Sequence, residues 1–167
     1  MPKSAAFPEA RWHFIGNIQS RRISEIVASS TLIHSCTNDA MPRKSIMQPP
    51  SFPRCRTLIE VNVSGEASKS GWRRPRRPIC VRAWPPCPTC PCALMTMAPA
   101  GDAQAAREAF AGLAELAVQI RAQLPAEDAA VFTELSMGMS DDWREAVPLG
   151  ATIVRVGRAI FSESYQE

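Results

Sequence analysis

The sequence lacks a long apolar run, an amino-terminal export signal and an internal repeat. Its longest apolar windows are interrupted by Arg, Glu or Pro well before the roughly 20 residues that a membrane-spanning helix needs. The segment after Met1 has no apolar stretch of the kind that forms the centre of a signal peptide. We therefore expect a cytoplasmic protein that does not span a membrane and whose cysteines are reduced thiols.

The six cysteines lack the full spacing of a zinc site. Four of them offer thiolates that could reach one tetrahedral ion, namely Cys80, Cys87, Cys90 and Cys92. A structural zinc site normally adds a second, well-separated Cys pair, and prolines beside Cys87 and Cys90 restrict the turn that would bring their sulfurs together. We predict no metal site.

The net charge of +3 is small, but the charges are unevenly distributed over the 167 residues. Residues 102–167 carry most of the acids, and one stretch gathers Lys69, Arg73, Arg74, Arg76, Arg77 and Arg82. Such a stretch could bind RNA or DNA, with Trp72 and Trp84 stacking on bases. We favour an irregular segment with no nucleic-acid partner, because short basic runs are common.

Apolar patterning predicts strands alternating with helices. We expect strands over 12–15, 31–35, 57–63 and 94–97, and helices over 18–27 and 103–124. The second helix is rich in Ala, Glu and Leu, and its apolar face comprises Phe110, Leu113, Ala114, Leu116, Ala117 and Ile120. This order of elements predicts an α/β fold with parallel strands joined by right-handed crossovers.

Residues 134–161 have the pattern of a phosphate-binding unit. We expect a strand over 131–135, a turn over 136–139, and a helix that begins after an N-cap at 140–142 and includes Trp143, Ala146 and Val147. A second strand over 151–156 leads to Gly157 and a short helix over 158–161. Ser or Gly at the carboxyl ends of two consecutive strands is typical of the phosphate site of (β/α) barrels.

Five segments, in the same order along the chain, resemble signatures of the pyridoxal phosphate homeostasis family. They are RWHFIGNIQ (11–19), LIHS (32–35), LIEVNVSGEASKSG (58–71), LMTM (94–97) and residues 134–161. The resemblance covers about the carboxyl two-thirds of a family member. It implies a barrel of the alanine racemase amino-terminal type, with pyridoxal 5'-phosphate (PLP) as a small-molecule cofactor and no catalytic residues.

The resemblance also implies which side chains contact the cofactor. Ser136 and Gly157 would hold its phosphate, and Arg155 would lie near the pyridine nitrogen and keep it unprotonated. The full set of expected cofactor-binding residues is His34, Asn62, Met95, Ser136, Met137, Gly138, Arg155 and Gly157. For His13 a purely structural role is at least as plausible as a ligand role.

The chain departs from the family at its start. Members bind PLP through a Schiff-base lysine on the first barrel strand and carry a Gly-Glu-Asn motif after the second, and neither feature is present here. None of the lysines lies on an apolar strand: Lys3 is in a polar start, Lys44 in an irregular segment and Lys69 in a Gly- and Ser-rich loop. We therefore expect a single domain over 1–167 that is an incomplete TIM-type barrel without its first two strands, with weak or non-covalent PLP binding. The unpaired edge at His13 and Phe14 predicts poor stability or self-association.

Two internal segments, 36–56 and 72–93, also differ from the family. The first contains Pro42, Pro49, Pro50 and Pro53 where the family has a helix, and proline inside a helix costs about 3 kcal/mol or more. Since both flanks of each segment match, a reading-frame shift in the gene would explain them. Two other functions stay open: a fragment of a PLP-dependent racemase-like enzyme, and a basic, Pro-rich nucleic-acid or interaction module.

Overall fold

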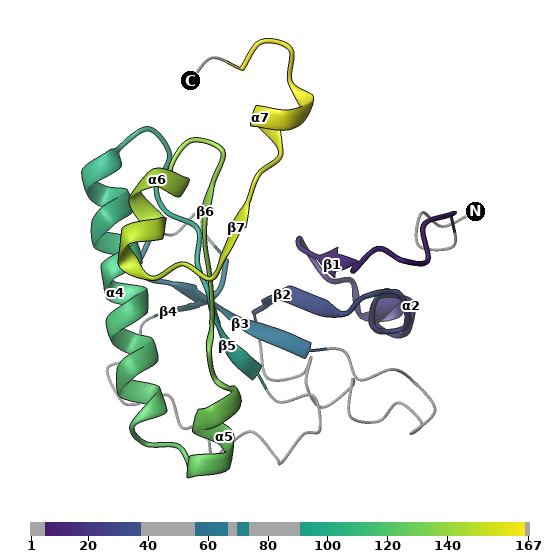
Figure 1. Ribbon diagram of the computed structural model, residues 1–167, viewed down its shortest axis with the longest axis horizontal. Coiled ribbons are helices and arrows are strands. Elements are labelled where there is room, and N and C mark those ends of the chain that lie inside the picture. The colour runs from purple at the N-terminus through teal and green to yellow at the C-terminus, as the bar shows by residue number, and fades with distance from the viewer. Residues whose placement is uncertain (1–5, 38–55, 67–69, 74–90, 166–167) are drawn as a thin grey trace.

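The computed structural model describes residues 6–37, 56–66, 70–73 and 91–165. Its sheet is parallel throughout, with the strand order β1-β2-β3-β5-β6-β7, and β4 pairs separately with β3. The strands are β1 (His13–Phe14), β2 (Leu32–Cys36), β3 (Arg56–Asn62), β4 (Trp72–Arg73), β5 (Pro91–Met95), β6 (Glu134–Met139) and β7 (Ile153–Arg155). The expected α/β class is confirmed, and the six strands of the main path form a curled half-barrel (Figure 1).

Helices follow most of the strands, as a parallel sheet requires. They are η1 (Ser20–Arg22), α2 (Ile23–Ser29), α4 (Ala103–Arg121), α5 (Ala126–Val131), α6 (Trp143–Ala146), η3 (Val147–Leu149) and α7 (Arg158–Phe161). Figure 1 shows α4 and α6 side by side along one face of the sheet, while α7 lies on an arm beyond β7. Within the described ranges, no helix has both the length and the apolar character needed to cross a bilayer.

Helix α4 confirms the most regular pattern of the sequence. Asp102 caps its first turn by accepting hydrogen bonds from the backbone N–H of Gln104 at 2.9 Å and of Ala105 at 3.0 Å. One face of the helix is buried against the sheet and consists of Ala106, Ala109, Phe110, Leu113, Leu116 and Ile120. The helix ends at Arg121, three residues before the predicted end.

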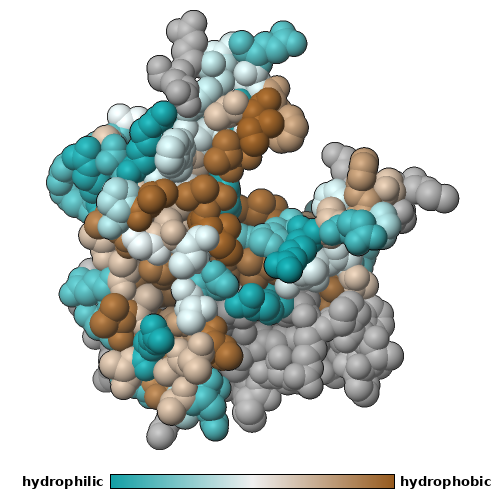
Figure 2. Space-filling model, viewed as in Figure 1, coloured by the Kyte–Doolittle hydropathy of each residue, from teal (hydrophilic) through white to brown (hydrophobic). Residues whose placement is uncertain are grey.

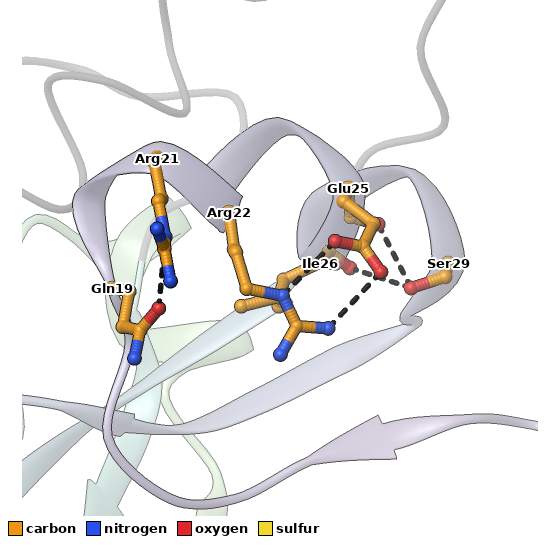
Figure 3. A network of polar contacts seen from close by, with 6 residues as sticks. All are labelled: Gln19, Arg21, Arg22, Glu25, Ile26 and Ser29. Atoms are coloured by element: carbon orange, nitrogen blue, oxygen red, sulfur yellow. Dashed lines mark hydrogen bonds and ion pairs between the residues drawn. The ribbon is translucent and has the colours of Figure 1, made fainter.

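The predicted helix over 18–27 is shorter and shifted along the chain. A 3-10 turn precedes α2, whose buried residues are Ile23, Ile26 and Val27. On its exposed side, Arg22 donates to both carboxylate oxygens of Glu25 at 3.0 Å, and the Ser29 hydroxyl donates to the Glu25 carbonyl at 2.9 Å (Figure 3). These contacts are local to the helix surface, so they position no other element.

The two faces of the sheet bury different side chains. The outer face joins the helices in one large apolar cluster, which includes Ile33, Ile59, Leu94, Phe110 and Met137. The inner face holds a small apolar cluster made of Leu32, Leu58 and Met95, against which Met97 and Ile153 pack. The alternation of neighbours such as Leu58 and Ile59 between the clusters follows from the two-residue period of a strand.

The prediction for residues 131–139 was wrong in its boundaries. Val131 ends helix α5, which follows Pro125, and the predicted turn at Ser136–Met139 is the second part of strand β6. The strand continues because its first half pairs in register with β5, with Met95 opposite Ser136. Gly138 has φ +90°, and an added Cβ would lie 2.8 Å from the Ala146 Cβ, so the absence of a side chain lets β6 pack against α6.

Other boundaries need correction as well. Ser140 does not cap α6, which starts after Asp142, and β7 is shorter than the predicted strand over 151–156. The expected irregular segments 36–56 and 72–93 were drawn too wide, because their edges pair in the sheet as parts of β2, β3, β4 and β5. Their central parts lie outside the described residues, as do all three lysines, Trp84 and most of the basic stretch.

Candidate functional site

Arg155 occupies the inner side of the half-barrel at the end of β7. Its Nη1 donates to the Ser136 hydroxyl oxygen at 2.8 Å, and its Nη2 donates to the Thr96 carbonyl oxygen at 3.0 Å. The third nitrogen of the guanidinium, Nε, is buried and its N–H has no hydrogen-bond partner among the described residues. A buried unpaired N–H is costly, so this donor is suited to an acceptor atom that the protein itself does not supply.

The charge of Arg155 is held in a partly buried setting. Burial lowers the pKa of Arg155, while the carboxylates of Asp142 and Glu60 raise it. A guanidinium stays protonated in proteins, so the side chain presents a fixed cation whose Nε–H has no partner among the described residues.

His34 and His13 extend the same polar group across the sheet. The Ser136 Oγ lies 2.8 Å from His34 Nδ1, and His34 Nε2 lies 3.1 Å from His13 Nδ1. Burial lowers the pKa of His34 to about 4, and the charges of His13 and Arg155 add to the effect. Burial also lowers the pKa of His13, against an opposing contribution from Glu134. Both imidazoles are therefore neutral at pH 7.

Ser140 links β6 to the start of α7. Its buried hydroxyl oxygen accepts hydrogen bonds from the backbone N–H of Gly157 and of Ala159, each at 3.2 Å. The Tyr165 hydroxyl donates to the Ser140 carbonyl oxygen. Gly157 has no heavy atom within 4 Å of the position that a Cβ would take, so its backbone borders open space.

The remaining expected residues lie in three different settings. Met95 is fully buried in the small inner cluster, at the strand position that pairs with Ser136. Met137 is buried in the outer cluster, on the helix side of the sheet, and Gly138 contacts α6. The Asn62 side chain shapes the turn that follows β3, since its Nδ2 donates to the Glu66 carbonyl at 2.7 Å and its Oδ1 accepts from Gly65 N–H at 2.9 Å.

The structure thus joins only part of the predicted set. Direct hydrogen bonds connect His34, Ser136 and Arg155, and Gly157 is linked to the same strand through Ser140. Among the described residues, no three His, Cys, Asp or Glu side chains group as metal ligands would. A separate surface hollow of about 350 Å³ lies between α4 and the α6–η3 segment, far from Arg155, and includes Arg107, Glu145 and Leu149 in its lining.

Comparison with known proteins decides the family. No model of a protein family matches the sequence. The curated pyridoxal phosphate homeostasis protein of Synechocystis is 33% identical over 164 residues, which make up 95% of this chain and 72% of that protein. The chain belongs to the pyridoxal phosphate homeostasis protein family. The human protein of the same name is 32% identical over 168 residues, and this chain spans 59% of its length.

Solved structures agree with this membership of the homeostasis family. PipY of Synechococcus elongatus, determined without PLP, superposes with a TM-score of 0.71 at 28% identity, covering 96% of this chain and 76% of PipY. PipY with PLP bound gives a TM-score of 0.68 at 27% identity and covers 74% of that chain. A Bifidobacterium adolescentis protein of unknown function gives 0.79 at 30% identity, with 60% of its chain covered.

Three residues of the site were not among those predicted from the sequence. Thr96 contributes a backbone carbonyl, so its side chain gives no signal in the sequence. Ser140 was interpreted as a helix cap, and a serine before two acids is typical of that role. His13 was expected to have a structural role at least as readily as a ligand role. Sequence spacing cannot show that strands β1 and β2 place the imidazoles of His13 and His34 in contact.

Proposed function

We propose that this chain binds pyridoxal 5'-phosphate without covalent attachment and does not catalyse a reaction on it. The observation that supports the proposal is the buried Nε–H of Arg155, a donor without a protein acceptor, held by two other hydrogen bonds of the same guanidinium. Membership of the homeostasis family and the PLP-bound structure of PipY, which is similar over 96% of this chain, identify the ligand.

The residues present fit the pyridine ring of the cofactor. Arg155 would donate its Nε–H to the ring nitrogen, which is an acceptor only when it carries no proton. A fixed cation at that position disfavours protonation of the nitrogen. When bound, PLP supplies an aldehyde and a ring that can withdraw electrons, and this withdrawal is weaker when the ring nitrogen is unprotonated. An arginine there therefore favours carrying the cofactor over using it.

The loop after β6 and the turn before α7 fit the phosphate. Ser140 Oγ accepts two backbone N–H groups, so its own hydroxyl hydrogen is available for an outside oxygen. The open space beside Gly157 lets a phosphate approach the backbone closely. Ser140 would thus donate to the phosphate in the open space beside Gly157, while Arg155 holds the other end of the ring.

We infer that this chain binds PLP more weakly than family members that carry the Schiff-base lysine. The family's Schiff-base lysine has no counterpart in a matching segment, and the chain spans 72% of the Synechocystis relative and 64% of the Vibrio cholerae relative. A full barrel of this type would place two further strands between β7 and β1. The described strands contact the ring position from one side only.

The open edges of the described sheet lead us to propose self-association. Among the described strands, β1 pairs only with β2 and β7 only with β6, so each has an open edge. Exposed apolar side chains follow the β7 edge, with Val154 and Val156 each 37% exposed and Ile160 66% exposed. Figure 2 shows apolar surface along the arm that carries α7, beside a notch in the outline of the molecule. Open edges with apolar neighbours favour association between copies.

PLP binding is tested by titrating the purified protein with PLP and following absorbance and heat. We expect saturable binding that Arg155→Gln weakens at least tenfold, because a hydrogen bond from a charged group contributes roughly 1.5–3 kcal/mol. Arg121→Gln removes the same charge at the exposed end of α4 and should leave the affinity unchanged. Equal PLP affinities of Arg155→Gln and Arg121→Gln would contradict a PLP site at Arg155. A pyridoxyl group on a lysine after borohydride treatment would contradict non-covalent binding.

Self-association is tested by light scattering on a size-exclusion column over a range of protein concentrations. We expect mass above one chain that falls on dilution. Val154→Lys places a charge beside the open edge of β7 and should shift the equilibrium toward single chains. A single-chain mass at all concentrations would contradict the proposal.

A further inference from the structure

The hydrogen bond between His34 and Ser136 joins two strands that are not neighbours. In the sheet order, β3 and β5 lie between β2 and β6. Strands lie about 4.8 Å apart, so a flat sheet would separate β2 from β6 by about 14 Å. The observed distance of 2.8 Å between His34 Nδ1 and Ser136 Oγ therefore crosses the inside of the curled sheet. Side chains from opposite walls meet there, in one layer of the half-barrel interior.

The donor and acceptor chemistry of Arg155, Ser136, His34 and His13 decides which atom donates in each of their hydrogen bonds. Arg155 can only donate, so Ser136 Oγ accepts its Nη1–H. The Ser136 hydroxyl hydrogen then points to His34 Nδ1, which must be unprotonated. A neutral His34 carries its proton on Nε2 and donates it to His13 Nδ1. All three hydrogen bonds run the same way, from Arg155 through Ser136 and His34 to His13.

The opposite direction leaves the Ser136 hydroxyl hydrogen without an acceptor among the described residues. If His34 Nδ1 carried the proton, Ser136 Oγ would accept from both Arg155 and His34. Its own hydroxyl hydrogen would then need another acceptor, and none contacts it within the described ranges. Ser136 is 0% exposed, so bulk solvent does not reach it. An unsatisfied buried donor costs about 1–3 kcal/mol.

We propose that His34, in its Nε2–H form, is a positioning residue for Arg155. By accepting the Ser136 hydrogen, His34 keeps the Ser136 oxygen turned toward Arg155 Nη1. That contact and the one to Thr96 hold the guanidinium so that Nε is its one nitrogen without a hydrogen-bond partner among the described residues. This inference rests on the proposed PLP site and assigns part of its affinity to a residue that need not touch the cofactor's ring nitrogen.

The relay formed by Arg155, Ser136, His34 and His13 also has a pH limit. A protonated His34 would have N–H groups on both sides of its ring, and its Nδ1–H would face the Ser136 hydroxyl hydrogen. The charged groups that act on the two imidazoles are Arg155, Glu134, Arg11 and Arg56. Of these only Glu134 favours protonation of the imidazoles. The hydrogen bonds of the relay therefore persist at neutral pH and are lost in acid, when His34 becomes protonated.

The direction of the relay can be measured without any cofactor. The sequence has two histidines, so ¹⁵N labelling of imidazoles gives two ring systems, and the His13→Gln variant assigns them. At pH 7 we expect the His34 ring to show an unprotonated Nδ1 and a protonated Nε2, with no averaging between tautomers. A protonated Nδ1, or an averaged pair of signals, would overturn the proposal.

The positioning role is tested by PLP titration of two variants. His34→Ala removes the acceptor and should weaken PLP binding about tenfold. In His34→Asn, the introduced Oδ1 takes the place of Nδ1 and accepts the Ser136 hydrogen, so most of the affinity should return. Equal affinity of wild type and His34→Ala, both folded by circular dichroism, would overturn the positioning role while leaving the PLP site intact. Absence of PLP binding in the wild type would instead defeat the proposed function, and the imidazole spectrum would still decide the direction of the relay.

Discussion

The two faces of the curled sheet differ in what they bury. The outer face packs against α4 and α6 through a continuous apolar cluster of 18 buried residues, whereas the inner face buries an apolar cluster of three residues beside a chain of polar groups. Apolar burial contributes most of the stability of a domain, and oriented polar groups contribute selectivity. The comparison teaches that stability and ligand chemistry are carried by opposite sides of the same strands. Apolar substitutions on the outer side should therefore leave PLP binding by the folded protein largely intact.

The largest effect is expected on the outer face. Phe110 is fully buried between α4 and the sheet, and Phe110→Ala should lower the free energy of unfolding by about 3–5 kcal/mol because it leaves a cavity. Val118 lies on the same helix and is 69% exposed, so Val118→Ala serves as the control and should change stability by less than about 0.5 kcal/mol. Urea unfolding followed by circular dichroism measures both. Similar losses in the two variants would show that α4 does not pack as described.

Acid should act first on the inner face. The pKa of His34 is 6.5 when unfolded and about 4 when folded, so the folded state favours the neutral ring. The stabilisation is complete above pH 6.5 and is lost as the pH falls toward 4, by at most about 3 kcal/mol. In His34→Gln this part of the pH dependence should be absent. Urea midpoints of both proteins between pH 7 and pH 4 measure the difference, and parallel curves would contradict the burial of a neutral His34.

Gly138, which packs against α6, and Gly157, which borders the proposed phosphate position, separate stability from PLP binding. Gly138→Ala brings a Cβ to 2.8 Å from Ala146 Cβ at a residue with φ +90°, and should cost about 1–3 kcal/mol of stability. Gly157→Ala meets no atom within 4 Å and should cost less than about 0.5 kcal/mol. PLP titration should show the reverse order, with weaker binding only in folded Gly157→Ala. Unchanged PLP affinity in Gly157→Ala would remove the phosphate role of this turn.

The smallest effect is expected on the surface of α2. Arg22 and Glu25 form a paired contact that solvent surrounds, and such pairs add little because water and salt screen them. Arg22→Gln should leave both the urea midpoint and the PLP affinity unchanged at 50 mM and at 500 mM salt, two conditions chosen at roughly a threefold difference in screening length. A salt-dependent loss of stability in Arg22→Gln would indicate that the Arg22–Glu25 pair contributes to the free energy of unfolding.

The sequence allowed some parts of this account to be predicted and not others. Helix α4 and strands β2 and β3 were found within a few residues, since their apolar periods are regular and their flanks carry caps or turns. Ser136 and Arg155 were found because family motifs surround them. Strand β6 was misplaced, because a strand that contains Ser and Gly resembles a turn until its partner β5 is known.

The relay between Arg155 and His13 could not be predicted from sequence patterns. His34 and Ser136 are 102 residues apart, and their contact depends on the curl of four strands rather than on any local spacing. Helix α5 was missed for a related reason. It is six residues long with no buried residues, so it has no apolar face for a pattern to reveal. Short elements and cross-sheet contacts are set by tertiary packing.

The most direct test of the PLP site is an NMR titration that observes the Nε–H groups of ¹⁵N-labelled arginines. Arg155→Lys identifies the Arg155 signal, which should be protected from exchange with water because its Nε–H is buried. On addition of PLP we expect that signal to move and saturate, while the signal of Arg121 at the far end of α4 stays in place. An Arg155 signal that does not respond to excess PLP in the folded protein would contradict the account.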